Sequence, residues 1–217
     1  MIHWSFSGLK DYSSCPKKYY HLRVAEDHVN TVSEQMSYGT AVHKAAEDYV
    51  RDGTPLAKNY EQFKAALDAL LAIKGTRYVE HKMALCEDKN PCDFGDGKRW
   101  VRGVVDLLIV DGESAYIVDY KTGSNKYPDT KQLKLMALMA YAHFPEVDHI
   151  KAALLFITRN SFVPEEYRRS DISRLWAEFT PTLERLRLAY ENSMWPPSPS
   201  GLCGWCPVNS CKFHRER

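Results

Sequence analysis

The chain has 217 residues, of which 44% are hydrophobic and 26% are charged, and its formal net charge is +1. This length predicts one domain with a single substantial core, and the composition excludes an intrinsically disordered chain. A net charge near zero gives no global electrostatic argument for nucleic-acid binding, so any such surface must be local. No apolar run approaches the length of a membrane span, and the first residues lack the hydrophobic segment of a signal peptide. We therefore expect a cytoplasmic protein.

The hydrophobic periodicity predicts an alternation of helices and strands. The predicted helices cover residues 9–14 (capped by Ser7), 33–51, 59–73, 130–142 and 171–193 (bent at Pro181). The predicted strands are residues 78–85, the two arms of a central hairpin, and a buried run at 150–158. This order predicts an α/β core in which helices cover both faces of a mixed sheet.

The central hairpin carries the most informative pattern in the chain. Two apolar runs, GVVDLLIV and AYIVDYKTG, flank an Asp-Gly turn, which is a strong hairpin signal. A two-residue loop would place Asp106 opposite Ile117, whereas a four-residue loop through Ser114 would place it opposite Asp119. In both registers Asp106, Asp119 and Lys121 share one face, because side chains alternate along a strand. The two carboxylates are therefore neighbours.

Two like charges on an apolar hairpin repel each other, and burial raises the cost. Lys121 can pair with one carboxylate, which leaves the other without a partner. A divalent cation resolves the conflict, because two carboxylate oxygens, a backbone carbonyl and waters suit Mg²⁺ or Mn²⁺. The Lys121 ammonium beside the cation could orient a water or neutralise a developing negative charge. For an isolated D…DxK pattern, an ordinary hairpin with solvent-facing charges is the alternative.

Other motifs accompany this pattern along the chain. In order, they are Gly39 and His43 on a predicted helix, Glu80 on a strand, Gly103–Asp106, Asp119–Lys121, and Gln132 at the start of the next helix. In this order the set resembles the PD-(D/E)XK nuclease superfamily, and specifically its RecB-like exonuclease branch. The resemblance runs from about Ser5 to Cys211. It implies a restriction-endonuclease-like core with an N-terminal helical elaboration.

The resemblance also implies an activity and its residues. The expected protein is a metal-dependent deoxyribonuclease, an exonuclease acting at DNA ends or in single strands. The implied catalytic residues are Asp106, Asp119, Lys121 and Glu80; the metal ligands are His43, Asp106 and Asp119; the DNA-binding residues are Gln132 and Tyr141. Gln132 belongs to a QxxxY element that contacts DNA or positions the lysine. Here the tyrosine of that element is replaced by Met136, and Tyr141 is the nearest tyrosine.

A second signal lies in the three cysteines Cys203, Cys206 and Cys211. This spacing in a cytosolic chain favours a metal over disulfides. His214 would complete a zinc site, whereas Cys15 would complete the four thiolates of a [4Fe–4S] cluster. Cys15 followed by proline, together with a C-terminal three-cysteine group, resembles the iron–sulfur members of this nuclease branch, which include CRISPR-associated exonucleases. We therefore favour the cluster, which would join the first helix to the tail.

These patterns predict a nuclease domain over residues 1–194, with a linker and Cys-rich metal-binding tail at 195–217 packed on the N-terminal segment. The predicted partners are DNA, as single strands or duplex ends, and a helicase or recombination protein. Two other functions stay open: a non-catalytic nucleic-acid-binding module, and a nuclease subunit active only within a helicase or recombination complex. The intact Asp106, Asp119 and Lys121 count against the first of these.

Overall fold

The computed structural model describes residues 2–29 and 33–215. The contacts within this part of the chain divide it into two compact units. The first comprises residues 33–175, and the second combines residues 2–29 with residues 176–215. The boundary that the sequence suggested at residue 194 lies inside the second unit. No helix of the described ranges is long and apolar enough to cross a membrane.

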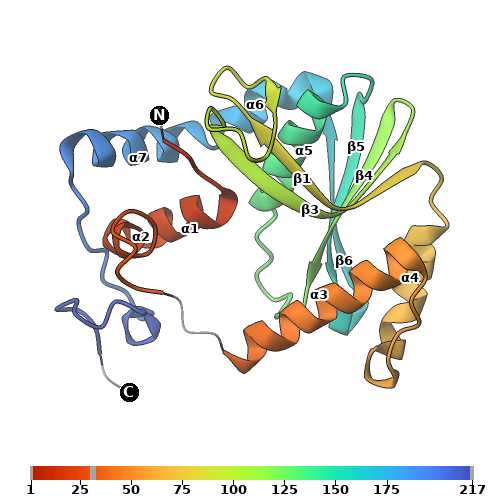
Figure 1. Ribbon diagram of the computed structural model, residues 1–217, viewed down its shortest axis with the longest axis horizontal. Coiled ribbons are helices and arrows are strands. Elements are labelled where there is room, and N and C mark those ends of the chain that lie inside the picture. Colours follow the sequence, from red (N-terminus) through yellow and green to blue (C-terminus); the bar gives the residue numbers. More distant parts are fainter. Residues whose placement is uncertain (1, 30–32, 216–217) are drawn as a thin grey trace. The chain divides into compact units, whose positions relative to one another are not determined.

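A six-stranded mixed sheet forms the centre of the first unit, in the order β2-β1-β3-β4-β5-β6 (Figure 1). The strands are β1 (Thr76–Leu85), β2 (Pro91–Cys92), β3 (Val101–Asp111), β4 (Ser114–Lys121), β5 (His149–Phe156) and β6 (Ser161–Arg168). β4 and β5 are parallel, and the other neighbours are antiparallel. The parallel pair requires a crossover, which α5 (Lys131–His143) supplies. The predicted α/β class with a mixed sheet is confirmed.

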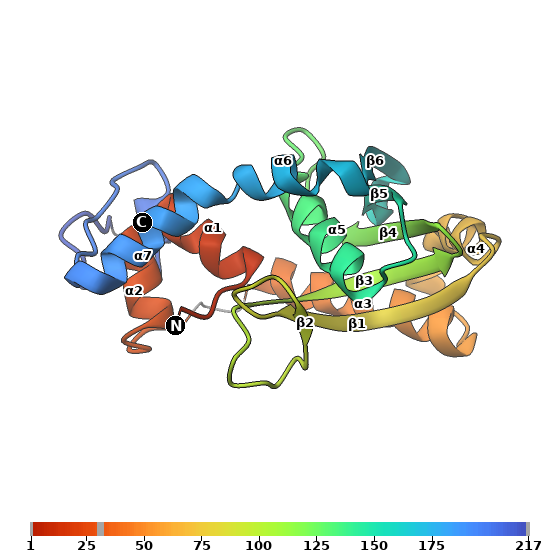
Figure 2. The same cartoon turned by 90° about the horizontal axis from the view of Figure 1, so that it is seen from above.

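Helices cover both faces of this sheet. α3 (Glu34–Asp52) and α5 lie on opposite faces (Figure 2). α4 (Lys64–Leu71), which follows a 3₁₀ turn over Lys58–Phe63, shares the core of α3. That core contains Val42, Ala46 and Val50 from α3, Leu67 and Leu70 from α4, and Leu107, Ile109, Val118 and Tyr120 from the sheet. The spacing of four residues on α3 gives the helix one apolar side.

The register of the central hairpin decides which side chains meet at its far end. β3 and β4 pair from Asp111–Ser114 at the turn to Leu107–Val118. Asp106 and Asp119 occupy the next position in the same register. The register with Asp106 opposite Asp119 is therefore the one adopted, although the loop comprises only Gly112 and Glu113 and not four residues; the register with Asp106 opposite Ile117 is wrong.

The second unit contains α1 (Phe6–Ser14), α2 (Pro16–Arg23), α7 (Thr180–Asn192) and the tail. α1 begins three residues earlier than predicted, because Ser5 rather than Ser7 is its cap and accepts a hydrogen bond from the Gly8 N–H at 3.3 Å. The helix predicted over residues 171–193 is two helices, α6 (Ile172–Ala177) and α7. Pro181 lies in the first turn of α7, where its missing N–H leaves no bond unmade.

Strand β6 was not predicted. Its sequence, SFVPEEYR, is polar and contains Pro164, which pairs with Ala153 of β5. Proline is compatible with an edge strand, where one row of backbone N–H groups has no strand partner. An edge position at the end of the sheet therefore explains why this segment lacks the alternation of a buried strand.

Gly75 lies just before β1 and close to Val110 of β3. A substitution there tests the close approach of these two strands. Its φ is +125°, and a Cβ atom there would lie 2.5 Å from the Val110 carbonyl oxygen. We expect Gly75→Ala to lower the free energy of unfolding by about 2–3 kcal/mol, since it adds both backbone strain and a clash. Gly97→Ala, at a position with no atom within 4 Å, is the matched control and should change it by less than about 0.5 kcal/mol. Urea denaturation measures both; equal effects would contradict this packing.

Candidate active site

Asp106 and Asp119 lie where the ladder between β3 and β4 ends. Asp106 Oδ2 accepts a hydrogen bond from the Tyr120 backbone N–H at 2.6 Å, so a side chain takes the place of a strand carbonyl. The Asp119 residue is 2% exposed, and the Asp106 side chain is 13% exposed. The sheet thus holds two carboxylates next to each other with little access to water.

This arrangement is electrostatically costly for Asp119. Burial, and then the charge of Asp106, raise the pKa of Asp119 to about 6, although Lys121 and His43 oppose the shift. Asp119 Oδ2 forms an ion pair with Lys121 Nζ, with the two atoms 2.5 Å apart. Among the described residues, Lys121 forms no ion pair with Asp106. One ammonium therefore does not satisfy both carboxylates.

His43 reaches the aspartates from α3. Its Nδ1 lies 3.5 Å from Asp106 Oδ2, and its ring meets Tyr120 edge-on with centroids 5.9 Å apart. Burial lowers the pKa of His43, but the contact with Asp106 and the charges of Asp106 and Asp119 outweigh it, so the net shift is upward. The imidazole is thus attracted to the carboxylate pair and its ring plane is fixed by Tyr120.

Gly39 lets the start of α3 approach the end of β4. A Cβ atom on Gly39 would lie 3.2 Å from Thr122 Oγ1, which is closer than most side chains tolerate. The glycine lies one helical turn before His43. Its missing side chain therefore allows the helix to bring the imidazole to the strand that carries Asp119 and Lys121.

Lys121 is held from the opposite face by α5. Its Nζ donates a hydrogen bond to Gln132 Oε1 at 3.0 Å, and its side chain is 32% exposed. Gln132 lies in the first turn of α5. The ammonium is therefore fixed between the Asp119 carboxylate and the Gln132 amide while keeping one side open to solvent.

Glu80 also faces this group. The pairing of β1 with β3 skips Glu80 and Asp106, between Val79–Leu107 and His81–Val105, and Glu80 has a φ of +52°. Burial, followed by the charge of Asp106, raises the pKa of Glu80. A non-glycine residue in this conformation is strained, and such strain often occurs at functional sites.

Glu47 is a further charged residue near Glu80, and the sequence analysis did not identify it. It lies four residues after His43 on α3, so both side chains are on the same side of the helix. Its charge contributes to the raised pKa of Glu80, and it forms ion pairs with Lys44 and Arg51. The spacing from His43 was the available signal.

Tyr141 is not brought to this site. It is 2% exposed, and its hydroxyl donates to the Asp148 carbonyl oxygen at 3.3 Å. The Arg169 guanidinium lies over its ring at 5.1 Å. In the structure Tyr141 is a core residue at the far part of α5 and presents no surface to a ligand.

The residues at the hairpin end fit a divalent cation. The donor set is two adjacent carboxylates and an imidazole, which suits Mg²⁺ or Mn²⁺. Asp119 is almost fully buried beside a second carboxylate, and a cation bound by both would offset their repulsion. His43, Asp106 and Asp119 are therefore the residues that could hold a metal, with Lys121 beside them.

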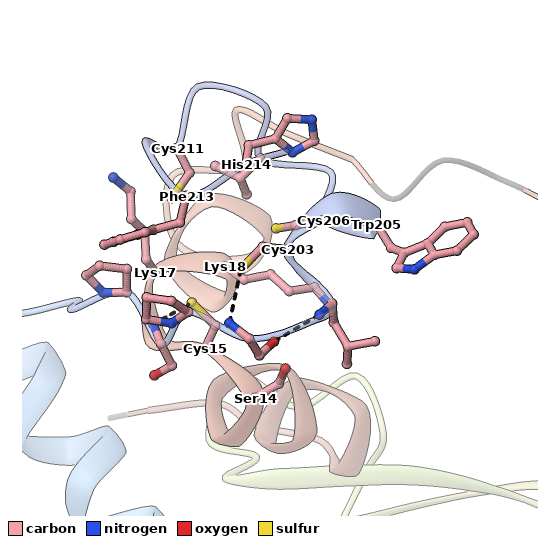
Figure 3. Close-up of a pocket in the computed structure, with 16 residues that line it drawn as sticks. Ser14, Cys15, Lys17, Lys18, Cys203, Trp205, Cys206, Cys211, Phe213 and His214 are labelled. Atoms are coloured by element: carbon pink, nitrogen blue, oxygen red, sulfur yellow. Dashed lines mark hydrogen bonds between the residues drawn. The ribbon is translucent and has the colours of Figure 1, made fainter. Parts of the chain in front are cut away.

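The four cysteines of interest lie together in the second unit. Cys15, Cys203, Cys206 and Cys211 are all partly buried and line one pocket of about 190 Å³. Figure 3 shows their sulfur atoms gathered between the start of α2 and the tail. The Ser198 N–H donates to Cys15 Sγ, and the Ser200 N–H donates to Cys203 Sγ, each at 3.3 Å. His214 lines the same pocket, and its Nδ1 is buried without a partner among the described residues.

Comparisons with known proteins show the family of the chain. The family model of the PD-(D/E)XK nuclease superfamily matches residues 3–87 and 72–211. The chain belongs to this superfamily. Its substrate class is therefore nucleic acid, and its reaction class is phosphodiester hydrolysis.

A solved structure shares the fold at low sequence identity. A protein of Eubacterium rectale, described as a "putative exonuclease", is 13% identical with a TM-score of 0.54, and the match covers 99% of this chain and 88% of that one. The crystal structure of SSO0001 is also 13% identical over the same shares of the two chains, with a TM-score of 0.46. No curated protein sequence matches the chain.

The raised pKa of Asp119 predicts a pH-dependent stability. Ionised Asp119 destabilises the metal-free fold above pH 6, and this penalty disappears as the pH falls toward the ordinary carboxyl pKa of 3.8. In EDTA, Asp119→Asn should therefore raise the free energy of unfolding by about 1–3 kcal/mol at pH 8 and by much less at pH 4.5. Asp111→Asn, at the exposed hairpin turn, is the control. Urea denaturation at both pH values measures the effect, and an equal gain at both would contradict this account.

Proposed function

We propose that the protein is a metal-dependent deoxyribonuclease that acts as an exonuclease on DNA ends or single strands. The observation that carries the proposal is the convergence of Asp106, Asp119 and Lys121 at the end of one strand ladder. Superfamily membership supports hydrolysis of a phosphodiester bond. The description of the Eubacterium rectale neighbour as a "putative exonuclease" is consistent with the exonuclease mode.

In this proposal each residue of the site has one role. His43, Asp106 and Asp119 hold Mg²⁺ or Mn²⁺, which when bound would polarise the scissile phosphate and lower the pKa of a water. Lys121 orients the attacking water and neutralises charge that develops on the phosphate. Gln132 keeps the lysine in place through the 3.0 Å hydrogen bond.

Glu80 and nearby lysines have supporting roles. The raised pKa of Glu80 and its position opposite Asp106 suit a carboxyl group at the rim of the site, where it can accept or return a proton. Lys126, Lys131 and Lys134 follow Lys121 in the sequence and supply local positive charge for DNA phosphates.

Loss of activity in two variants tests this assignment. Asp119→Ala and Lys121→Ala should each reduce Mg²⁺- or Mn²⁺-dependent digestion of end-labelled DNA by at least about a hundredfold, because each removes a group acting at the reacting phosphate. Asp111→Ala, on the same hairpin but exposed, is the control and should keep the parent rate. Circular dichroism establishes folding, and the size of the labelled product separates exonuclease from endonuclease action.

The same assay has outcomes against the proposal. Folded Asp119→Ala protein that digests DNA at the parent rate would overturn the active-site assignment. A parent protein that binds DNA yet cleaves neither single nor double strands would favour the non-catalytic module, or a subunit that needs a helicase or recombination partner.

For the tail we propose a [4Fe–4S] cluster held by Cys15, Cys203, Cys206 and Cys211. The shared pocket and the two N–H donors to sulfur support it, since four thiolates with nearby hydrogen bonds suit such a cluster. Its role would be structural, because it would link residues far apart in the sequence. The alternative is Zn²⁺ bound by Cys203, Cys206, Cys211 and His214.

Elemental analysis of anaerobically purified protein separates the two. The cluster predicts brown protein containing iron, with colour and thermal stability lost together in Cys15→Ala and retained in His214→Ala. Cys86→Ala, a cysteine outside the pocket, is the control. Colourless protein that contains zinc, is insensitive to Cys15→Ala and is destabilised by His214→Ala would contradict the cluster.

A further inference from the structure

Two histidines and an aspartate converge in the second unit, apart from the residues of both sites described above. His21 is in the last turn of α2, and Asp27 and His28 lie in the segment that follows. Asp27 Oδ1 is 2.9 Å from His21 Nδ1 and 2.8 Å from His28 Nδ1. One potential ligand atom from each residue lies within 4.8 Å of the other two. All three ligand atoms thus surround one point.

The backbone after α2 is folded so that the three side chains meet. The N–H groups of Val24 and Ala25 both donate to the Tyr20 carbonyl oxygen at 2.9 Å, which ends the helix. Glu26 then takes a φ of +51°, and the chain turns back toward His21. The two imidazole rings are 5.0 Å apart, inclined at 70°. The approach of both rings to one carboxylate is therefore built by the local chain path.

The cluster around Asp27 differs from an ordinary surface pair of one imidazole with one carboxylate. The pair His149–Glu166, at 3.3 Å, shows the usual form, with one imidazole for one carboxylate. Around Asp27, one carboxylate faces two imidazoles. The cation nearest in sequence, Arg23, pairs with Asp11 at 3.0 Å. Two imidazoles that share one carboxylate match a ligand set of divalent transition metals.

We propose that His21, Asp27 and His28 form a binding site for a divalent transition-metal ion of the Zn²⁺ class. Two imidazole nitrogens and one carboxylate oxygen are ligands that Zn²⁺ accepts at about 2.0–2.2 Å, which places neighbouring ligand atoms roughly 3.3 Å apart. The observed contacts of 2.8 and 2.9 Å require only small shifts to reach this separation. The Asp27 side chain is 49% exposed, whereas those of His21 and His28 are 16% and 19% exposed. Water can therefore fill the remaining coordination position from the open side.

Such an ion would fix the end of α2 to the segment that follows it. The first residue before α2 is Cys15, which lines the cysteine pocket. Metal at the His21 site would therefore anchor the helix at its other end, independently of what the cysteines bind. We expect added Zn²⁺ to raise the stability of the fold, by an amount that grows with the logarithm of the free Zn²⁺ concentration above the Kd of the site.

The test is Zn²⁺ binding by the full chain, purified with its tail metal retained, and measured by equilibrium dialysis with elemental analysis. We expect His21→Gln and His28→Gln each to bind one equivalent less Zn²⁺ than the parent, or to bind it at least tenfold more weakly. His149→Gln is the matched control, since it removes a histidine paired with one carboxylate, and it should bind as the parent does. Other zinc-binding residues are unchanged in all four proteins, so the difference reports this site alone.

The readout is zinc content and not DNA cleavage, so it stays separate from the nuclease proposal. His28 lies outside regular secondary structure, so His28→Gln provides a second variant if His21→Gln perturbs α2. Addition of Zn²⁺ should also raise the melting temperature of the parent more than that of His28→Gln. Unchanged zinc stoichiometry and affinity in folded His28→Gln protein would overturn the proposal.

Discussion

The first unit depends on two carboxylates that the strand register places side by side. Asp106 and Asp119 would repel each other anywhere, and near-complete burial of Asp119 makes the repulsion costly. The surrounding groups reduce this cost only in part: the Tyr120 N–H satisfies one oxygen of Asp106, and Lys121 faces one oxygen of Asp119. A fold selected for stability alone would not retain this pair, and the proposed binding of a cation would account for its presence.

The elements around the pair are arranged to supply what the sheet cannot. A helix on each face contributes one side chain: α3 brings His43 to the carboxylates, and α5 brings Gln132 to Lys121. Gly39 allows the first of these helices to lie close to the strand end, and Glu80 takes a strained backbone conformation at the same level of the sheet. Core packing of both helices therefore fixes the geometry of the polar groups, so the site is preorganised by the hydrophobic core.

The sequence predicted what depends on local periodicity. Strand alternation put Asp106 and Asp119 on one face in either hairpin register, but the register itself depends on the packing of both strands and could not be chosen from the turn residues. Tyr141 was predicted to bind DNA because it is the nearest tyrosine in the sequence to the QxxxY element. Its position on α5 instead places its side chain in the core. Glu47 was missed because its relation to the site arises from the contact between α3 and β1. The edge strand with Pro164 was missed because an edge strand tolerates proline and polar residues, so its sequence lacks the apolar alternation from which strands are predicted.

The central claim is that the paired carboxylates bind a divalent cation together with His43. Anomalous diffraction from crystals grown with Mn²⁺ tests it most directly, because the difference map locates the ion without reference to activity. The account predicts one strong peak within coordinating distance of carboxylate oxygens of both Asp106 and Asp119, with the His43 ring as a further ligand, and no such peak in Asp119→Asn crystals. An ion bound elsewhere in the parent protein, with none between the two aspartates at Mn²⁺ concentrations that support DNA cleavage, would contradict it.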